Sequence, residues 1–306
     1  MVVIAPAHLT IFSANYIPIA GDGQYCVRSM PWRLRGVPAV TDNLAVSGTS
    51  WRKRIGRAEE LTVQYPFAAE LLDFYGHLAR FQESLSLRLD RAPAGGFSDP
   101  LEADLLRDGS EPFLLMAEKY GPSRLADVAR RLLSTEMHSG WFDLLNATWS
   151  ATEHMPSEPQ DFLARAFLQP LAERVRLHHP APRGGTGNRL CPFCQRKPGA
   201  GVLRPQGDGA LRSLLCSFCF AEWDFRRIAC ANCGEENNKK LPVYIASEFP
   251  HVRVECCDSC KTYIKSVDLT KSGHADPVVD EIASASLDLW AQKRAYAKLH
   301  LNLLGL

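Results

Sequence analysis

The sequence has little that would direct the chain to a membrane or to a polyanion. No stretch reaches the roughly 18 unbroken apolar residues of a membrane-spanning helix. Residues 1–21 are mildly apolar, but they lack a basic start and Pro6 and Pro18 interrupt them, so no secretion signal is expected. Basic and acidic residues nearly balance, 35 against 34, and the total charge therefore favours neither nucleic acid nor an anionic membrane surface.

Common catalytic signatures are also missing. The chain has no nucleophile elbow, no P-loop, no dinucleotide-binding fingerprint and no paired-carboxylate motif. The sequence therefore gives no motif for any of these classes of enzyme.

Cysteine is almost confined to one segment. Of the 10 cysteines, only Cys26 lies outside residues 191–260. Eight of the others form four Cys-x-x-Cys pairs, separated by 21, 10 and 23 residues. This long–short–long spacing is typical of two four-cysteine metal ribbons in tandem, because two tight turns with two cysteines each can complete a tetrahedron of thiolates. The predicted ligands are Cys191, Cys194, Cys216 and Cys219 for the first site, and Cys230, Cys233, Cys257 and Cys260 for the second.

Other uses of these thiols fit the sequence less well. Cys256 lies beside Cys257 and could replace it, but the other three pairs all have two intervening residues, which favours Cys257. Disulfides are not expected, because the knuckle spacing indicates metal thiolates in a reducing cytoplasm. Thiol–disulfide exchange needs a cysteine at a helix N-terminus in a βαβ context, and none of the pairs has that context.

Short β-like runs surround the cysteine pairs in the same order in both halves. A run follows the first pair of each half (201–206 and 242–247), and another leads into its second pair (212–215 and 252–255). Strands that carry Trp223 or Tyr263 are expected near the second pair, with 225–228 and 263–267 as the strands that leave it. The repetition indicates a duplicated module.

Helical periodicity dominates the rest of the chain. A helix is expected from about Trp51, and the next carries an apolar stripe from Phe67 to Leu85. Shorter helices are predicted over 101–107, 111–120, 124–134 and 136–152. A last one, 158–177, should be kinked or divided at Pro170. After the ribbons, residues 277–298 read as one helix.

The predicted fold class is α+β, with an N-terminal all-α helical domain, two tandem small β modules of rubredoxin-like or zinc-ribbon type, and a C-terminal helix. The expected divisions are an irregular extension (1–45), the helical domain (46–180), a Pro/Gly linker (181–188), the two ribbons (189–226 and 227–270) and the C-terminal helix (271–306).

A nucleic-acid-binding zinc ribbon is the alternative function. Residues 189–271 hold 13 Lys and Arg against 9 Asp and Glu. Two divalent tetrathiolate centres would each add a charge of about −2, so the ribbons would be close to neutral, which disfavours nucleic acid. Trp223 and Tyr263 could stack on bases, but packing against the metal sites is favoured.

The ribbon segment resembles the formate dehydrogenase accessory protein (FdhE) family of bacteria. The resemblance rests on CPFC, GVLRPQ, LRSLLCSFCFAEWDFRRIACANCGE and ECCDSCKTYIKSVDL, with VVDEIASASLDLWAQKRAY near the C-terminus. In the helical half, RIGRAEEL and PFAAELLDFYGHLARFQ are similar as well, so the resemblance spans about residues 51–306.

This resemblance implies a cytoplasmic maturation factor that is not itself an enzyme. Its partner would be the catalytic (alpha) subunit of formate dehydrogenase, with no nucleic acid and no membrane insertion; a homodimer stays open. The family's paired-cysteine modules are described as rubredoxin-like and iron-binding, so the eight cysteines above would hold two ions, iron or zinc.

Overall fold

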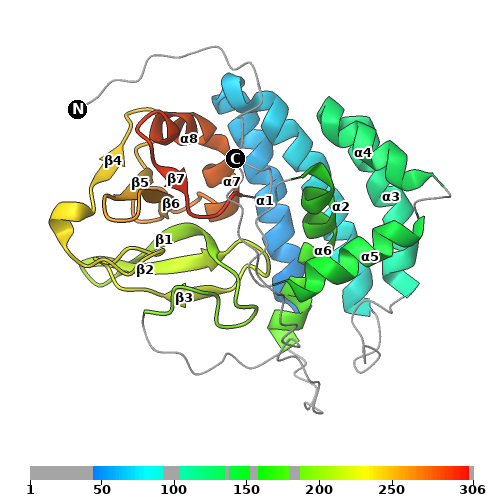
Figure 1. The fold of residues 1–306 in the computed structure, drawn as a ribbon, viewed down its shortest axis with the longest axis horizontal. Coiled ribbons are helices and arrows are strands. Elements are labelled where there is room, and N and C mark those ends of the chain that lie inside the picture. The colour runs from blue at the N-terminus through cyan, green and yellow to red at the C-terminus, as the bar shows by residue number, and fades with distance from the viewer. Residues whose placement is uncertain (1–43, 92–103, 135–137, 152–157, 179–186, 303–306) are drawn as a thin grey trace, which may run out of the picture.

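A computed structural model describes residues 44–91, 104–134, 138–151, 158–178 and 187–302 of the chain. Figure 1 shows helices α1–α6 on one side of the molecule and a β-sheet on the other, with α7 between them. The predicted extension (1–45), apart from the start of α1, and most of the predicted linker (181–188) lie outside the described residues.

The helical half begins with a hairpin of two long helices. Helix α1 (Leu44–Gln64) is followed by a short 3₁₀ helix, η1 (Pro66–Ala68), and by α2 (Ala69–Arg91). The predicted stripe of α2 buries Phe74, Leu78 and Leu85. Phe67 instead lies on η1 and is half exposed, because proline at the first position of η1 starts a separate turn there.

Four further helices complete this half: α3 (Asp104–Tyr120), α4 (Ser123–Leu133), α5 (His138–Ser150) and α6 (Pro159–His178). Aromatic rings from four helices meet in the core, where Phe113 lies 5.1–6.2 Å from the rings of Phe81, Trp141 and Phe167.

One predicted interruption of the helices is wrong, and of the two outcomes predicted at Pro170, a kink or a division, the division does not occur. Residues 101–107 and 111–120 were expected as separate helices, but α3 continues through Pro112, and α6 is not divided at Pro170. An internal proline costs a helix about 3 kcal/mol. Burial of apolar side chains on both sides of each proline offsets this cost (Leu106, Phe113 and Leu114 in α3; Phe167, Leu168 and Leu171 in α6).

The ribbons form one continuous sheet with the strand order β3-β2-β1-β6-β5-β4. The first ribbon supplies β1 (Pro198–Gln206), β2 (Gly209–Cys216) and β3 (Glu222–Asp224). After a short 3₁₀ helix, η3 (Asn238–Lys240), the second supplies β4 (Val243–Ile245), β5 (Val252–Cys257) and β6 (Thr262–Asp268). Pairing is antiparallel within each ribbon, and parallel pairing of β1 with β6 joins them.

Residues 225–228 do not form the strand that was predicted there. The strand that leaves the first ribbon is β3, which pairs with Ser213–Leu215. The following backbone turns toward Arg212, whose Nη1 donates to the carbonyls of Arg226 (2.8 Å) and Ala229 (3.1 Å). Those carbonyls are thus used by a side chain and not by a neighbouring strand.

The sequence predicted one helix over 277–298, but the C-terminal region is divided into three elements. It forms α7 (Pro277–Ala283), α8 (Ala285–Gln292) and a short strand, β7 (Ala297–Lys298), which pairs with β6. The break comes from buried Lys265 on β6, whose Nζ donates to the carbonyls of Glu281 (2.5 Å) and Ser284 (3.3 Å). Helix α7 packs on both α1 and β6, so the C-terminal region joins the two halves.

Candidate metal centres

The four Cys-x-x-Cys turns share one backbone shape. In each, the residue after the second cysteine has a positive φ: 59° at Gln195, 53° at Phe220, 80° at Gly234 and 53° at Lys261. This conformation favours glycine, and only Gly234 meets that preference. The left-handed residue turns the chain back so that both sulfurs of a pair face the same point.

The first centre, site 1, is formed by Cys191, Cys194, Cys216 and Cys219. Its sulfurs all lie within 4.8 Å of one another, with 3.6 Å between Cys191 and Cys219 and 3.4 Å between Cys194 and Cys216. None of the four residues is more than 6% exposed. Hydrogen bonds from the three neighbouring thiols lower the pKa of Cys194, whereas burial raises the pKa of Cys216.

The second centre, site 2, is formed by Cys230, Cys233, Cys257 and Cys260. Its sulfurs also lie within 4.8 Å of one another, with 3.7 Å in both the Cys230–Cys260 and Cys233–Cys257 pairs. Unlike site 1 it reaches solvent, because Cys233 is exposed and Cys260 is half-buried. Burial raises the pKa of Cys257 to about 12; for Cys260 burial acts in the same direction, but hydrogen bonds with Thr262 lower its pKa to about 6.

Both centres have the size that a tetrathiolate metal site needs. A zinc–sulfur bond of about 2.3 Å implies about 3.8 Å between the sulfurs of a tetrahedron, and the closest pairs here are separated by 3.4–3.7 Å. A donor set of four soft thiolates suits iron or zinc.

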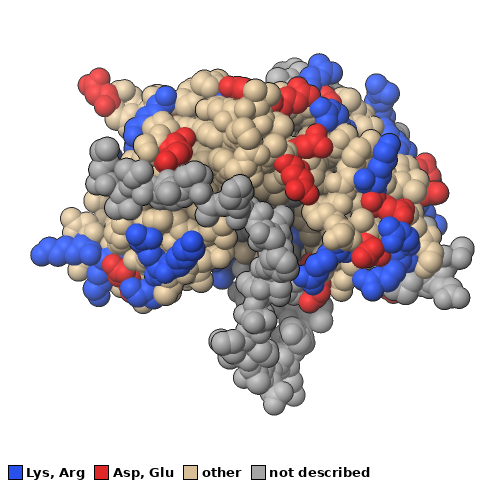
Figure 2. All heavy atoms as spheres, turned by 90° about the horizontal axis from the view of Figure 1, so that it is seen from above, with Lys and Arg blue, Asp and Glu red and all other residues tan. Residues whose placement is uncertain are grey.

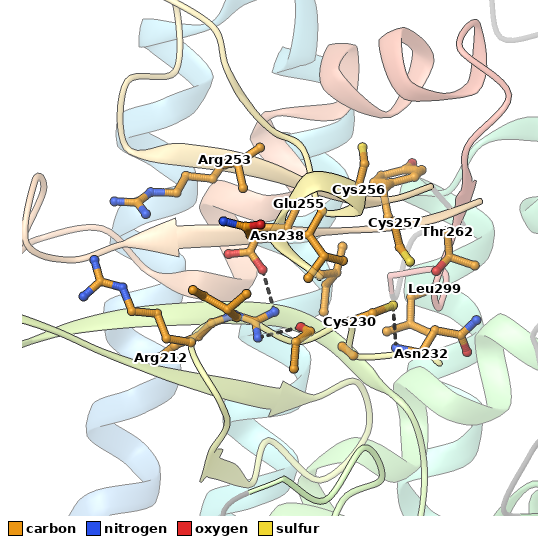
Figure 3. Close-up of a pocket in the computed structure, with 18 of the residues that line it drawn as sticks. Arg212, Cys230, Asn232, Asn238, Arg253, Glu255, Cys256, Cys257, Thr262 and Leu299 are labelled. Carbon is orange, nitrogen blue, oxygen red and sulfur yellow. Dashed lines mark hydrogen bonds and ion pairs between the residues drawn. The ribbon is translucent and has the colours of Figure 1, made fainter. Parts of the chain in front are cut away.

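Cys256 lies apart from site 2. It is next to Cys257 on β5, and successive side chains of a strand point to opposite faces. Figure 3 shows the Cys256 sulfur pointing away from Cys257 and Cys230. Burial raises the pKa of this thiol to about 12, so Cys256 is a neutral side chain of the core at neutral pH.

A cavity of about 220 Å³ lies beside site 2, between the two ribbons. Its wall includes the ion pair of Arg212 with Glu255, and it also includes Arg253, which pairs with Asp268. The first pair is drawn with a dashed line in Figure 3. Apolar side chains, among them Leu203, form much of the remaining wall.

The two aromatic residues that the sequence singled out are buried structural groups. Trp223 donates from Nε1 to the carbonyl of Asn188 at 2.7 Å, and the Tyr263 hydroxyl lies 2.7 Å from Asp288 Oδ1. Both aromatic side chains are buried, so they cannot stack on a base without rearrangement. Cys26 lies outside the described residues.

Two residues beside site 1 were missed. Arg165, on α6, and Arg196, two residues after Cys194, are buried next to its sulfurs. A signal for Arg165 was available: it lies between Leu163 and Phe167, on the buried side of a helix where an arginine is unusual.

The charges on one face of the molecule place few limits on partners. In the face shown in Figure 2, basic and acidic side chains are both spread over the surface. Within the part of the chain that the structure describes, no helix combines the length and hydropathy needed to cross a bilayer.

Comparison with known proteins gives consistent matches. Residues 190–227 match the model of the FdhE central domain, and residues 228–304 match that of the FdhE C-terminal domain. The chain is 28% identical over 275 residues to the protein FdhE homolog of Aquifex aeolicus, which covers 82% of this chain and 94% of that one. A Haemophilus influenzae (strain PittEE) homolog is also 28% identical, over 186 residues and 57% of its length.

A solved structure has the same fold. The crystal structure of the FdhE protein from Pseudomonas aeruginosa matches 84% of this chain and 96% of that chain, with a TM-score of 0.62 and 24% sequence identity. The two domain matches meet between the ribbons, and each contains one of the four-cysteine centres. The chain therefore belongs to the FdhE family.

Proposed function

We propose that this protein is a cytoplasmic accessory factor for formate dehydrogenase, which binds the catalytic subunit of that enzyme and supports its assembly or activation. The observation that carries the proposal is that both family domains match and that each contains a complete four-cysteine centre. The family name, FdhE, supports formate dehydrogenase as the client.

The eight cysteines of sites 1 and 2 would be the ligands of two metal ions, iron or zinc. Sulfur geometry at both centres supports this assignment. Ferric tetrathiolate absorbs strongly in the visible range and zinc tetrathiolate does not, so anaerobic purification followed by elemental analysis and a visible spectrum decides the metal. Two ions per chain are expected.

The protein would act by binding and not by catalysis. Its thiols are gathered for metal ligation, and the proposed role requires no chemical step on a substrate. The surface that contacts the client would be formed by the helical half, the ribbons or both.

A pull-down from the native bacterium tests the client. Tagged full-length protein should recover the formate dehydrogenase catalytic subunit, identified by mass spectrometry. The Cys256→Ala variant should recover the same subunit, because it alters a cysteine in the ribbons outside both centres. Recovery of nucleic acid without that subunit would overturn the proposal and favour a nucleic-acid-binding ribbon.

A further inference from the structure

The helical half contacts site 1 through one turn, residues 216–220. The Ser217 carbonyl accepts hydrogen bonds from Arg165 Nη2 (3.3 Å) and Gln169 Nε2 (3.1 Å). The Cys219 carbonyl accepts one from Arg176 Nε (3.0 Å). All three donors lie on α6, so this helix is bonded directly to the turn that carries two of the four sulfurs.

Aromatic contacts from two other helices reach the same turn. The ring of Trp51, on α1, lies edge-on to Phe220 with 5.7 Å between centroids. The ring of Trp149, on α5, meets Phe218 at 6.1 Å. The guanidinium of Arg196 also lies over the Phe218 ring, 3.7 Å from its centroid. The turn of site 1 is therefore the point where α1, α5 and α6 meet the ribbons.

Two buried positive charges lie at this junction. Arg165 is 2% exposed and Arg196 is 4% exposed. Arg196 donates from Nη2 to the Thr148 carbonyl, but Nη1 of each arginine has no hydrogen-bond partner among the described residues. Within the same residues, neither guanidinium forms an ion pair with a carboxylate. The Asp161 carboxylate, one helical turn before Arg165, favours the charged form of that guanidinium, but it is one negative charge for two buried cations. Two buried cations are costly unless further negative charge lies nearby.

The sulfurs of site 1 are the candidate source of that charge. Four thiolates around a divalent ion carry a net charge of −2, and around a trivalent ion −1. Burial lowers the pKa of the Arg165 guanidinium to about 10, so it stays charged at neutral pH. Nearby His300 adds no charge, because burial lowers its pKa to about 3.

We infer that Arg165 and Arg196 are the counter-charges of a divalent tetrathiolate at site 1, and that α6 docks stably on the site 1 turn only when this ion is bound. The inference rests on the proposed metal occupancy and not on the identity of the client. Arg165 is a positioning residue in this account, since it acts on the ion through the charge of the thiolates.

Site 2 has no such constraint. The carbonyls of its cysteine turns accept hydrogen bonds from the ribbon and the C-terminal segment. Ala297 N donates to the Lys261 carbonyl at 2.8 Å, and Arg189 donates to the Asn232 carbonyl. Lys261, beside Cys260, is exposed and pairs with Asp258. Because water reaches Cys233 and Cys260, it can screen the charge of this centre. Loss of the ion from site 2 should leave the helical half in place.

Hydrogen–deuterium exchange of α6 in the full-length zinc-loaded protein tests the coupling. The double variant Cys216→Ser/Cys219→Ser should lose protection of α6, whereas Cys257→Ser/Cys260→Ser should retain it. Should the site 1 variant not fold, graded removal of zinc from the wild-type protein replaces it: loss of α6 protection should follow release of the second ion. Protection of α6 in protein emptied of both ions would overturn the inference.

A charge series separates the role of Arg165 from packing. In the Cys257→Ser/Cys260→Ser background, Arg165→Met should weaken zinc binding at site 1 about tenfold or more, as expected for residues that support metal ligands. Arg165→Lys keeps the charge and should restore most of the affinity. Equal losses for Met and Lys would overturn the counter-charge role. Neither the exchange of α6 nor the zinc affinity of site 1 depends on the client. A pull-down that fails to recover the client subunit would therefore count against the proposed function and not against this inference.

Discussion

Arg57 on α1 and Asp280 on α7 form a two-point ion pair, with Nε 2.9 Å from Oδ2 and Nη2 2.6 Å from Oδ1. The two residues are 223 positions apart and both are buried. Asp280 also bonds to His251 Nε2, on the turn before β5, at 2.7 Å. One carboxylate thus connects the first helix, the sheet and the C-terminal segment.

Asp280→Asn should destabilise the protein by about 3–5 kcal/mol at pH 7, because the buried Arg57 guanidinium would keep only the exposed Glu60 carboxylate as its anion. Although burial raises the pKa of Asp280, hydrogen bonds with His251 and Arg57 outweigh it, so the pKa is lowered. Stability from a lowered pKa is present above the unfolded value of about 4 and is lost as pH falls through the folded value. Urea unfolding should show a constant gap from wild type between pH 5 and 8, narrowing below about pH 4.

Asp127→Asn is the control for that measurement. Asp127 forms an exposed ion pair with Arg130 one helical turn away, and its loss should cost less than about 1 kcal/mol. An Asp280→Asn effect no larger than this one would contradict the role of the buried pair.

Release of metal to a chelator should occur in two phases. Site 2 is open at Cys233, whereas site 1 is buried beneath three helices, so a colorimetric chelator should take one ion quickly and the other slowly. Cys257→Ser/Cys260→Ser should remove the fast phase and leave the slow one. A single phase, or a fast phase that persists in this variant, would argue against the difference between the centres.

Substitution of the neighbouring residues Cys256 and Cys257 should affect metal content differently. Cys256→Ala should retain two ions per chain and cost on the order of 1 kcal/mol of stability, from the small cavity that it leaves. Cys257→Ala should retain one ion, because its sulfur belongs to site 2. Elemental analysis of the two purified variants checks both outcomes, and retention of two ions by Cys257→Ala would show that the ligand set is wrong.

Gly201→Ala should destabilise the joint between the ribbons. A Cβ at Gly201 would lie 2.0 Å from Ser266 Oγ and 3.0 Å from its Cβ, across the parallel β1–β6 pairing. Overpacking of this kind costs about 1–3 kcal/mol. Ser266→Ala removes the closest atom, so the double variant should recover part of the loss in a thermal unfolding cycle. Additive effects of the two changes would contradict the contact.

Local features of the fold were predictable from the sequence. The cysteine spacing predicted both sulfur clusters, because each knuckle is a short turn whose shape depends on neighbouring residues. The stripe of α2 predicted its buried face, since helical periodicity is local too. Gly234 has the positive φ expected of a glycine after its cysteine pair, although three other residues adopt the same conformation without being glycine.

Features that depend on distant residues were not predictable. The break between α7 and α8 requires Lys265 from β6, and no local pattern marks its contact with the helix carbonyls. The expected separation of 101–107 from 111–120 was wrong, because core contacts on both sides of Pro112 offset the cost of that proline within α3. Arg165 and Arg196 approach site 1 only after the helices have packed on the ribbons.

The parallel pairing of β1 with β6 has a consequence for the order of folding. The hairpins β1–β2 and β5–β6 each join neighbouring segments, so they can form early with a small loss of chain entropy. Pairing of Val202 with Val267 closes a long loop that contains most of both ribbons. Each ribbon should therefore acquire its own turns first, and the central seam of the sheet should close last.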